Sequence, residues 1–196
     1  MYVDTGAIYR TVALRVREAG ADPSNPAQVE SLLEGLDIRM DYGEDGVQRM
    51  YLSGRDVTEA IRENAVSALA SQVAALPAVR DFLLDFQRRQ ARERDVVMDG
   101  RDIGTVVLPR ARVKIFLTAG TEARAERRLL ELRQRGQDAA FDTVLSDIIR
   151  RDEQDRNRAI APLRQAEDAV LLDTTRLDRA GSLEALLAIV RERLPQ

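Results

Sequence analysis

Four short apolar runs lie along the chain, and each ends in a polar or glycine-containing turn. They are Tyr2-Val3, Val96–Met98, Val113–Leu117 and Ala169–Leu172. Runs of this kind are typical of strands that are buried on both faces of a parallel sheet. Helical patterns follow three of them, and because strands that alternate with helices favour a parallel sheet flanked by helices, the sequence predicts an α/β fold.

Four apolar stripes with helical spacing predict amphipathic helices. Their residues are Ile8, Val12, Val16 and Ala19; Ala125, Leu129 and Leu132; Phe141, Val144, Leu145, Ile148 and Ile149; and Leu183, Leu186, Leu187, Val190 and Leu194. We expect Thr121 to cap the start of the second helix and Ser182 to open the fourth. Gly20 and Gly136 stand just past the first and second stripes, where helices commonly end.

The segment from about 37 to 94 interrupts the alternation of strand and helix. Residues 37–58 alternate with period two around a Gly-Glu-Asp-Gly turn, which predicts an antiparallel hairpin and a third strand. Residues 63–90 predict two helices divided at Pro77. We therefore expect a small subdomain at 37–94, inserted into a core domain formed by 1–36 and 95–196.

The composition limits the possible chemistry. The chain of 196 residues is 44% hydrophobic and 32% charged, as in globular proteins. It contains no cysteine and no histidine, which excludes disulfides, thiolate catalysis, Ser-His-Asp triads and histidine metal sites. Lys114 is the single lysine among 30 basic residues, so anion recognition falls to arginine, which grips phosphate with two donors at once.

The net charge and the hydropathy of the chain also limit the classes of partner that it could bind. A net charge of −3 argues against a nucleic-acid binder that works through a basic face, whereas a small phosphorylated ligand in a local basic pocket fits. No long apolar run and no signal-peptide pattern occur. We therefore expect a soluble, cytoplasmic protein with no membrane partner, and a monomer.

Three polar segments carry the candidate chemistry. "DGRDIGTVV" follows a predicted strand, at the edge where α/β folds bind ligands, although it could also be a plain polar turn. "RRDEQDRNRAIAP", residues 150–162, is either a solvated helix end or a mobile flap that carries arginines to a phosphate. "DTGAIYR" places Arg10 on a helix close to the same edge. Each segment alone is also compatible with a structural α/β domain whose arginines form surface ion pairs.

Together the motifs are more specific. "DTGAIYR", "SQVAALPAVR", "DGRDIGTVV", "VKIFLTA", "RDEQDRNRAIAPL" and "AEDAVLLDTT" occur in an order and spacing that resembles bacterial cytidylate kinase over nearly all of the chain. The resemblance implies a P-loop nucleoside-monophosphate kinase fold with a five-stranded parallel core. It further implies a monophosphate-binding insertion at 37–94 and a lid at about 150–162. The implied reaction is phosphoryl transfer from ATP to CMP or dCMP, with Mg²⁺.

The resemblance also implies roles for individual residues. Ser71, Arg80 and Asp102 would read cytosine, whose N4 donor suits a carboxylate and whose N3 and O2 acceptors suit an arginine and a serine. Thr5, Arg10 and Arg101 would hold the CMP phosphate, and Arg151, Asp155 and Arg158 would contact the ribose and the migrating phosphoryl group.

This transfer needs alignment and charge neutralisation rather than a covalent nucleophile, so Arg101, Arg151 and Arg158 are the implied catalytic residues. Asp99 would orient Mg²⁺ through water.

One motif of the family does not occur in the sequence, because no G-x-x-x-x-G-K-[ST] is found. The resemblance places this loop upstream of "DTGAIYR", in a strand–loop–helix unit of roughly 30 residues. We therefore expect a truncated kinase, without the first strand, P-loop and first helix, whose activity is doubtful. The alternative is a non-catalytic CMP-binding protein that has lost ATP binding.

The first strand of the family lies between the strands that correspond to Val96–Met98 and Val113–Leu117. About five buried apolar side chains at ~1.5–3 kcal/mol each would be lost with it, roughly 10 kcal/mol in all. Because that loss is comparable to the whole stability of a domain, about 5–15 kcal/mol, we expect poor folding or re-pairing of the strands.

Overall fold

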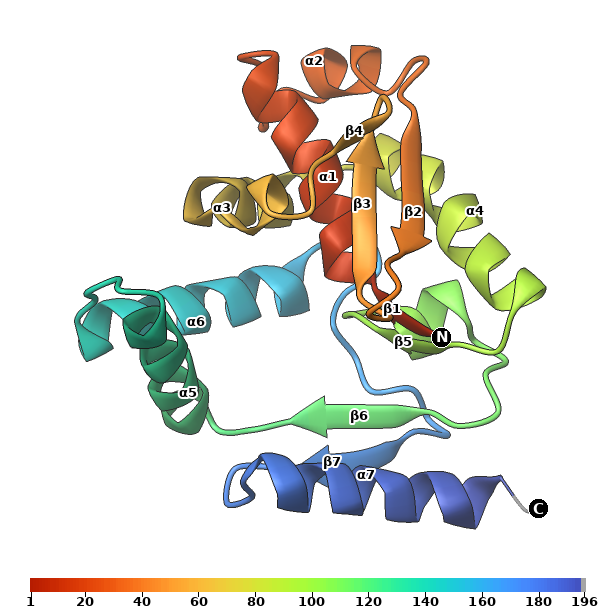
Figure 1. Ribbon diagram of the computed structural model, residues 1–196, viewed down its shortest axis with the longest axis vertical. Helices are drawn as coiled ribbons and strands as arrows, with labels where there is room; N and C mark the ends of the chain where they lie inside the picture. Colours follow the sequence, from red (N-terminus) through yellow and green to blue (C-terminus); the bar gives the residue numbers. More distant parts are fainter. Residues whose placement is uncertain (195–196) are drawn as a thin grey trace. The chain divides into compact units, whose positions relative to one another are not determined.

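The computed structural model describes residues 1–194 (Figure 1). The chain forms two compact units, which are described separately. The first contains Met1–Ile103 and Arg158–Ile160, and the second contains Gly104–Asn157 and the chain from Ala161 onward. The sequence predicts another division, into a core domain of 1–36 and 95–196 and an inserted subdomain at 37–94. That division stays a prediction. No helix in residues 1–194 is long and apolar enough to cross a membrane.

The first unit contains a parallel strand pair, a three-stranded antiparallel sheet and four α-helices. In chain order its elements are β1 (Tyr2–Asp4), α1 (Thr5–Glu18), α2 (Pro26–Ser31), β2 (Ile38–Tyr42), β3 (Gln48–Leu52), β4 (Arg55–Asp56), a 3₁₀ turn (Ala60–Arg62), α3 (Asn64–Val73), α4 (Pro77–Glu93) and β5 (Val97–Asp99). β1 pairs with β5 in parallel, with Asp4 opposite Asp99. β2, β3 and β4 form the predicted hairpin and third strand.

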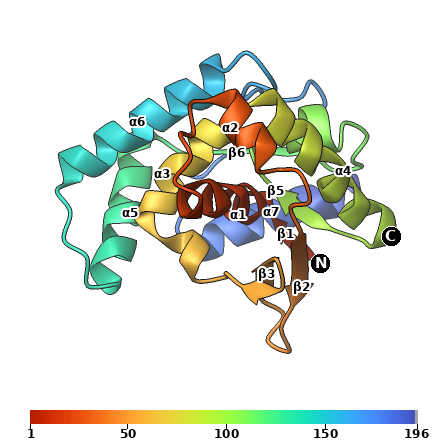
Figure 2. The same cartoon turned by 90° about the horizontal axis from the view of Figure 1, so that it is seen from above.

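Helix α1 is the centre of this unit. Its amino terminus is capped by Asp4, whose side chain accepts a hydrogen bond from the Ala7 amide, and it ends before Gly20, which has a φ of 65°. The apolar stripe packs against α3, α4 and β3 (Figure 2), and its core side chains Ile8, Val12 and Val16 are at most 1% exposed. The predicted helix, its end before Gly20 and the buried face of Ile8, Val12 and Val16 are thus confirmed. Ala19, also expected in the stripe, is the exposed C-cap residue.

The second unit contains one parallel strand pair and three helices. After a π-helical turn at Ile103–Val107, its elements are β6 (Ile115–Thr118), α5 (Thr121–Gln134), α6 (Phe141–Asn157), β7 (Val170–Asp173) and α7 (Arg179–Arg193). β6 pairs with β7 in parallel. α5 and α6 pack through a small cluster of Ala125, Leu129, Leu132 and Val144, and the Arg124 guanidinium on α5 donates to both carboxylate oxygens of Asp152 on α6 at 2.9 and 2.6 Å.

The predicted helix starts need correction. Gly120 precedes the first turn of α5, so Thr121 is the first helical residue rather than the cap. Helix α7 is capped by Asp178, whose side chain accepts from the Gly181 amide, and Ser182 lies within the first turn. An aspartate that accepts a backbone N–H is a strong helix cap, which explains the earlier start.

Helix α7 differs from the prediction in a second respect. None of its described residues is buried, and Leu183 is 57% exposed.

Helix α6 continues through the charged stretch as far as Asn157, so most of the predicted lid segment, 150–162, is helical.

The α/β class with parallel strands flanked by helices is confirmed, but the five-stranded sheet is not formed. Among residues 1–194 the parallel strands occur as two separate pairs, β1–β5 and β6–β7. The sequence predicted poor folding or re-paired strands, and within residues 1–194 the two pairs are not joined into one sheet. Val97 on β5 and Leu117 on β6 are accordingly 66% and 57% exposed.

Candidate functional site

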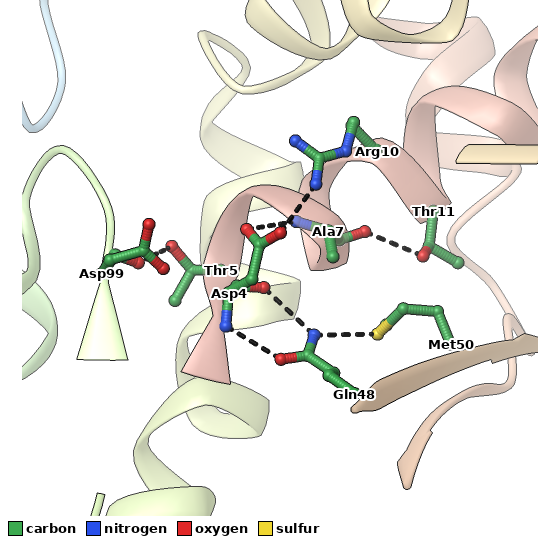
Figure 3. A network of polar contacts seen from close by, with 8 residues as sticks. All are labelled: Asp4, Thr5, Ala7, Arg10, Thr11, Gln48, Met50 and Asp99. Carbon is green, nitrogen blue, oxygen red and sulfur yellow. Dashed lines mark hydrogen bonds and ion pairs between the residues drawn. The ribbon is translucent and has the colours of Figure 1, made fainter. Parts of the chain in front are cut away.

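A polar network lies where β1 and β5 end, and Asp4 is its centre (Figure 3). One carboxylate oxygen of Asp4 accepts from the Ala7 amide at 2.9 Å, and the other accepts from Arg10 Nη2 at 2.8 Å. Thr5 is buried, and its hydroxyl donates to the backbone carbonyl of Asp99 at 2.6 Å. The helix cap therefore also orients Arg10, and the Asp99 carbonyl orients the Thr5 hydroxyl. The family resemblance assigns both groups to a phosphate.

Gln48 on β3 joins this network from the antiparallel sheet (Figure 3). Its Oε1 accepts from the Asp4 amide at 2.8 Å, and its Nε2 donates to the Asp4 carbonyl at 3.2 Å. Neither Asp4 nor Gln48 was predicted as part of the site. The Asp-Thr-Gly sequence before a helical stripe is a cap signal that could have identified Asp4, but no local pattern identifies a partner 44 residues away.

Arg10 keeps donors for a ligand. Its side chain is 23% exposed and pairs with Asp4 through one nitrogen, while its Nε is buried and has no hydrogen-bond partner among the described residues. A guanidinium presents five N–H donors. Arg10 can therefore bind an anion without giving up the contact with Asp4.

A second cluster contains three charged side chains that are almost fully buried. Arg80 on α4 forms an ion pair and a hydrogen bond with Asp102, and Arg158 Nη2 lies 3.7 Å from the other Asp102 oxygen. The Arg80, Asp102 and Arg158 side chains are 7%, 6% and 8% exposed. Arg80 also donates to the Ala74 carbonyl at 3.0 Å. Buried charges persist only when they are paired and hydrogen-bonded, and this cluster holds a carboxylate between two guanidinium groups.

Tyr9 adds an aromatic face to this cluster. The guanidinium carbon of Arg80 lies 5.7 Å from the centroid of the Tyr9 ring, within the range of a cation–π contact. Burial raises the pKa of the Tyr9 hydroxyl, and the positive charge of Arg80 acts in the opposite direction. Tyr9 was not among the predicted site residues.

The structure brings together some of the predicted residues and not others. Arg80, Asp102 and Arg158 are in contact, and Thr5 and Arg10 share the network of Asp4. Ser71 lies half-buried on α3, and its hydroxyl makes no hydrogen bond within residues 1–194; Arg101 is exposed in the turn after β5. Arg151 and Asp155 lie on α6, in the second unit. The ligand roles of all these residues stay predictions.

The carboxylates at the ends of β1 and β5 influence each other. The pKa of Asp99 is raised, first because its surroundings remove part of its water and second because the Asp4 carboxylate is close. The same two carboxylates, after partial burial, raise the pKa of Tyr2 to about 12. Burial and the proximity of these carboxylates thus disfavour the ionised forms of Asp99 and Tyr2.

The raised pKa of Asp99 predicts that the stability of the fold depends on pH, and that Asp99→Asn removes this contribution. Because the folded state holds the Asp99 proton more tightly than the unfolded chain, this group lowers stability as pH rises above its ordinary pKa of 3.8. Asparagine does not titrate, so we expect the stability of the variant relative to the wild type to increase as pH rises above that ordinary pKa. Asp99 retains solvent contact, which keeps the expected gain below about 1 kcal/mol. Urea unfolding midpoints at several pH values measure it, and a difference that does not change with pH would contradict it.

Comparisons with known proteins identify the family of the chain. A family model described as cytidylate kinase matches residues 1–192. Over 193 residues the chain is 48% identical to the cytidylate kinase of Geobacter sulfurreducens, an alignment that covers 98% of this chain and 82% of that protein. It is 46% identical to the cytidylate kinase of Carboxydothermus hydrogenoformans, with 96% and 85% covered, and 47% identical to that of Stutzerimonas stutzeri, with 98% and 84% covered.

These alignments give no support to the expectation of a truncated, inactive chain or to the non-catalytic alternative. The matches extend over both compact units and include every residue of the two polar clusters. The chain therefore belongs to the cytidylate kinase family.

Proposed function

We propose that this protein transfers the γ-phosphoryl group of ATP to CMP or dCMP and yields CDP or dCDP. The observation that carries the proposal is the buried Asp102 carboxylate between Arg80 and Arg158. A carboxylate held in this way presents a fixed acceptor, and the arginines beside it present fixed donors. That combination suits a base that offers one amino group next to two acceptors.

Cytosine fits this pattern and uracil does not. The N4 amino group of cytosine donates to Asp102, while N3 and O2 accept from Arg80 and from the hydroxyl of Ser71. Uracil carries a carbonyl oxygen in place of the amino group, so it would leave the Asp102 carboxylate facing another acceptor. An unpaired buried acceptor costs ~1–3 kcal/mol or more when it is charged, and we therefore expect CMP to be preferred over UMP.

Arginines supply the positive charge that a phosphate requires. In this proposal Thr5, Arg10 and Arg101 hold the phosphate of CMP. The contact between Asp4 and Arg10 at 2.8 Å supports this role, since it fixes the guanidinium before the ligand arrives. Arg151, Asp155 and Arg158 contact the ribose and the migrating phosphoryl group, and Arg101, Arg151 and Arg158 neutralise the charge that the transition state spreads over its oxygens.

The acidic side chains fit a magnesium ion that is held largely by phosphate oxygens and water. No group of three or more acidic residues in the described chain could form a metal cage, and Mg²⁺ typically binds one or two carboxylates together with substrate phosphates. Asp99, at the end of β5 and opposite Asp4, is the carboxylate that we assign to it. Bound there, the ion would supply charge neutralisation between the two nucleotides.

Binding of CMP to the purified chain tests the acceptor half of the proposal. Titration calorimetry is expected to give one site for CMP, with UMP binding at least about tenfold more weakly, the equivalent of ~1.4 kcal/mol. Equal binding of the two nucleotides, or no binding of CMP, would contradict the proposal.

Turnover tests the donor half. In a coupled assay for ADP with CMP, ATP and Mg²⁺, the proposal predicts ADP formation that requires CMP, although the sequence contains no G-x-x-x-x-G-K-[ST] motif. A normal rate would show that other residues bind the donor phosphates. CMP binding without ADP formation would favour the non-catalytic alternative.

A further inference from the structure

Gln48 is the polar exception on the buried face of β3. The strand alternates between buried and half-buried positions, and its three buried residues are Gln48, Met50 and Leu52. Gln48 is 8% exposed, and its amide nitrogen lies 3.3 Å from the Met50 sulfur. Because the inner face of such a strand normally carries apolar side chains, an amide at this position indicates a requirement other than packing.

The partner of the amide is the backbone of β1. This strand pairs with β5, and two side chains of the antiparallel hairpin bind its backbone as well. The Tyr42 hydroxyl donates to the Tyr2 carbonyl at 2.7 Å, and the Gln48 amide binds the N–H and the C=O of Asp4 at 2.8 and 3.2 Å. Tyr42 and Gln48 lie opposite each other in the register of β2 and β3. The end of the hairpin next to its turn is therefore fastened to β1 at two alternate residues.

Asp4 connects this contact to the helix that carries Arg10 (Figure 3). Its carboxylate accepts from the Ala7 amide at 2.9 Å and from Arg10 Nη2 at 2.8 Å. Because an aspartate side chain is short, the position of its backbone largely determines where the carboxylate lies. Gln48 binds both backbone groups of Asp4, so it fixes the residue that in turn holds Arg10.

We propose that Gln48 is a positioning residue for the phosphate of CMP, and that it acts through Asp4 on Arg10 without touching the nucleotide. With Gln48 in place, Asp4 keeps one conformation and the Arg10 guanidinium is oriented before the nucleotide binds. Without it, both side chains have to be ordered on binding, which weakens the affinity. The inference rests on the proposed function, since it concerns the same acceptor site.

Gln48→Met and Gln48→Asn remove the contacts with Asp4 in different ways. Methionine keeps the length and has no amide, whereas asparagine keeps an amide that is one methylene too short. We expect CMP to bind about fivefold more weakly to both, as for ordering one arginine side chain. Cytidine has no phosphate, and we expect its affinity to be unchanged. Titration calorimetry measures CMP, and chemical-shift titration measures cytidine.

The comparison of the two ligands separates positioning from a loss of stability. Both variants lower the urea midpoint, and by different amounts, because only asparagine leaves a cavity. A positioning role gives the same selective loss of CMP affinity in both variants. Equal losses for CMP and cytidine, or a loss of CMP affinity that follows the urea midpoint, would overturn the proposal.

Gln28→Met is the matched control. Gln28 on α2 also accepts from the backbone amide of an aspartate, Asp22, at 2.9 Å, but in an exposed turn. We expect its substitution to leave CMP affinity unchanged, and a loss equal to that of Gln48→Met would overturn the proposal. Arg10→Met tests the route. If Gln48 acts through Arg10, Gln48→Met costs no further CMP affinity in the Arg10→Met background, whereas additive losses would contradict that route.

Amide hydrogen exchange tests the same route without ligand. The Asp4 amide donates to Gln48, and the Ala7 amide donates to the Asp4 carboxylate. We expect both amides to exchange faster in Gln48→Met than in the wild type, relative to the amide of the buried Leu83 inside α4. A faster Asp4 amide with an unchanged Ala7 amide would overturn the proposal, because Gln48 would then hold the strand without orienting the carboxylate.

The failure of the inference can be distinguished from that of the proposed function. If the wild type binds no CMP, the proposed function fails and the inference with it. If the wild type binds CMP and the Gln48 variants bind it equally well, the inference alone fails.

Discussion

Replacement of Asp102 by alanine is expected to weaken CMP binding by about a hundredfold and to leave ATP binding unchanged. The loss contains a charge-assisted hydrogen bond to the base, worth about 1.5–3 kcal/mol, and the disorder of two arginines that the carboxylate holds in place. Because one partner of a buried ion pair is removed, we also expect the fold to lose about 3–5 kcal/mol. Calorimetry with each nucleotide and urea unfolding measure the two effects.

Two further variants make this result specific. Asp147→Ala removes a carboxylate from an exposed ion pair with Arg150, and we expect it to change stability by less than about 1 kcal/mol and CMP binding not at all. Asp102→Asn keeps the shape and adds an amide donor, which uracil can use, so the preference for CMP over UMP should narrow. Equal losses for CMP and ATP in Asp102→Ala would remove Asp102 from the acceptor site.

Gly100→Ala is expected to damage the phosphate side of the site. A Cβ at this position would lie 2.5 Å from the Thr5 hydroxyl and 2.8 and 2.9 Å from two side-chain carbons of Ile103. The turn after β5 would have to shift, and the hydrogen bond from Thr5 to the Asp99 carbonyl would break. We expect a loss of about 1–3 kcal/mol in stability, as for overpacking, and at least about tenfold weaker CMP binding, as for a lost phosphate ligand.

Gly120→Ala is the control for this variant. The nearest atoms to its added Cβ lie at 3.5 and 3.6 Å, both in Thr175, which is ordinary van der Waals contact. We expect its stability to change by less than about 1 kcal/mol, the usual range for an Ala in place of a Gly at a helix cap, with unchanged CMP affinity. If Gly100→Ala behaves in the same way, the close approach of Thr5 to this turn is not needed for binding.

The sequence predicted the elements well where local chemistry determines them. Gly20 ends α1, Pro77 begins α4, and the turn around Gly46 closes the hairpin between β2 and β3. The starts of α5 and α7 were misplaced, since Gly120 precedes α5 where Thr121 was expected as the cap, and Asp178 caps α7 where Ser182 was expected to open the helix. The stripe of α7 was read correctly as periodic, but periodicity does not say whether a partner covers it.

The candidate site was predicted only in part, because local patterns indicate residues but not which distant residues they contact. The motif "DGRDIGTVV" and the arginines of residues 150–162 drew attention to Asp102 and Arg158. The proximity of these two side chains depends on how the chain folds over 56 positions, which no local pattern encodes. The same holds for the contact of Gln48 with Asp4. Long-range polar partners are fixed by packing, and they are the part of a site that one sequence leaves open.

The contact between Gln48 and Asp4 has a consequence for the independence of the antiparallel sheet. An amide that pairs with both the N–H and the C=O of one residue takes the place that a neighbouring strand would take in a ladder. The Gln48 side chain of β3 thus satisfies the backbone of β1 at Asp4, the residue that caps α1 and pairs with Arg10. Insertions or deletions that shift the hairpin register are therefore expected to alter phosphate binding.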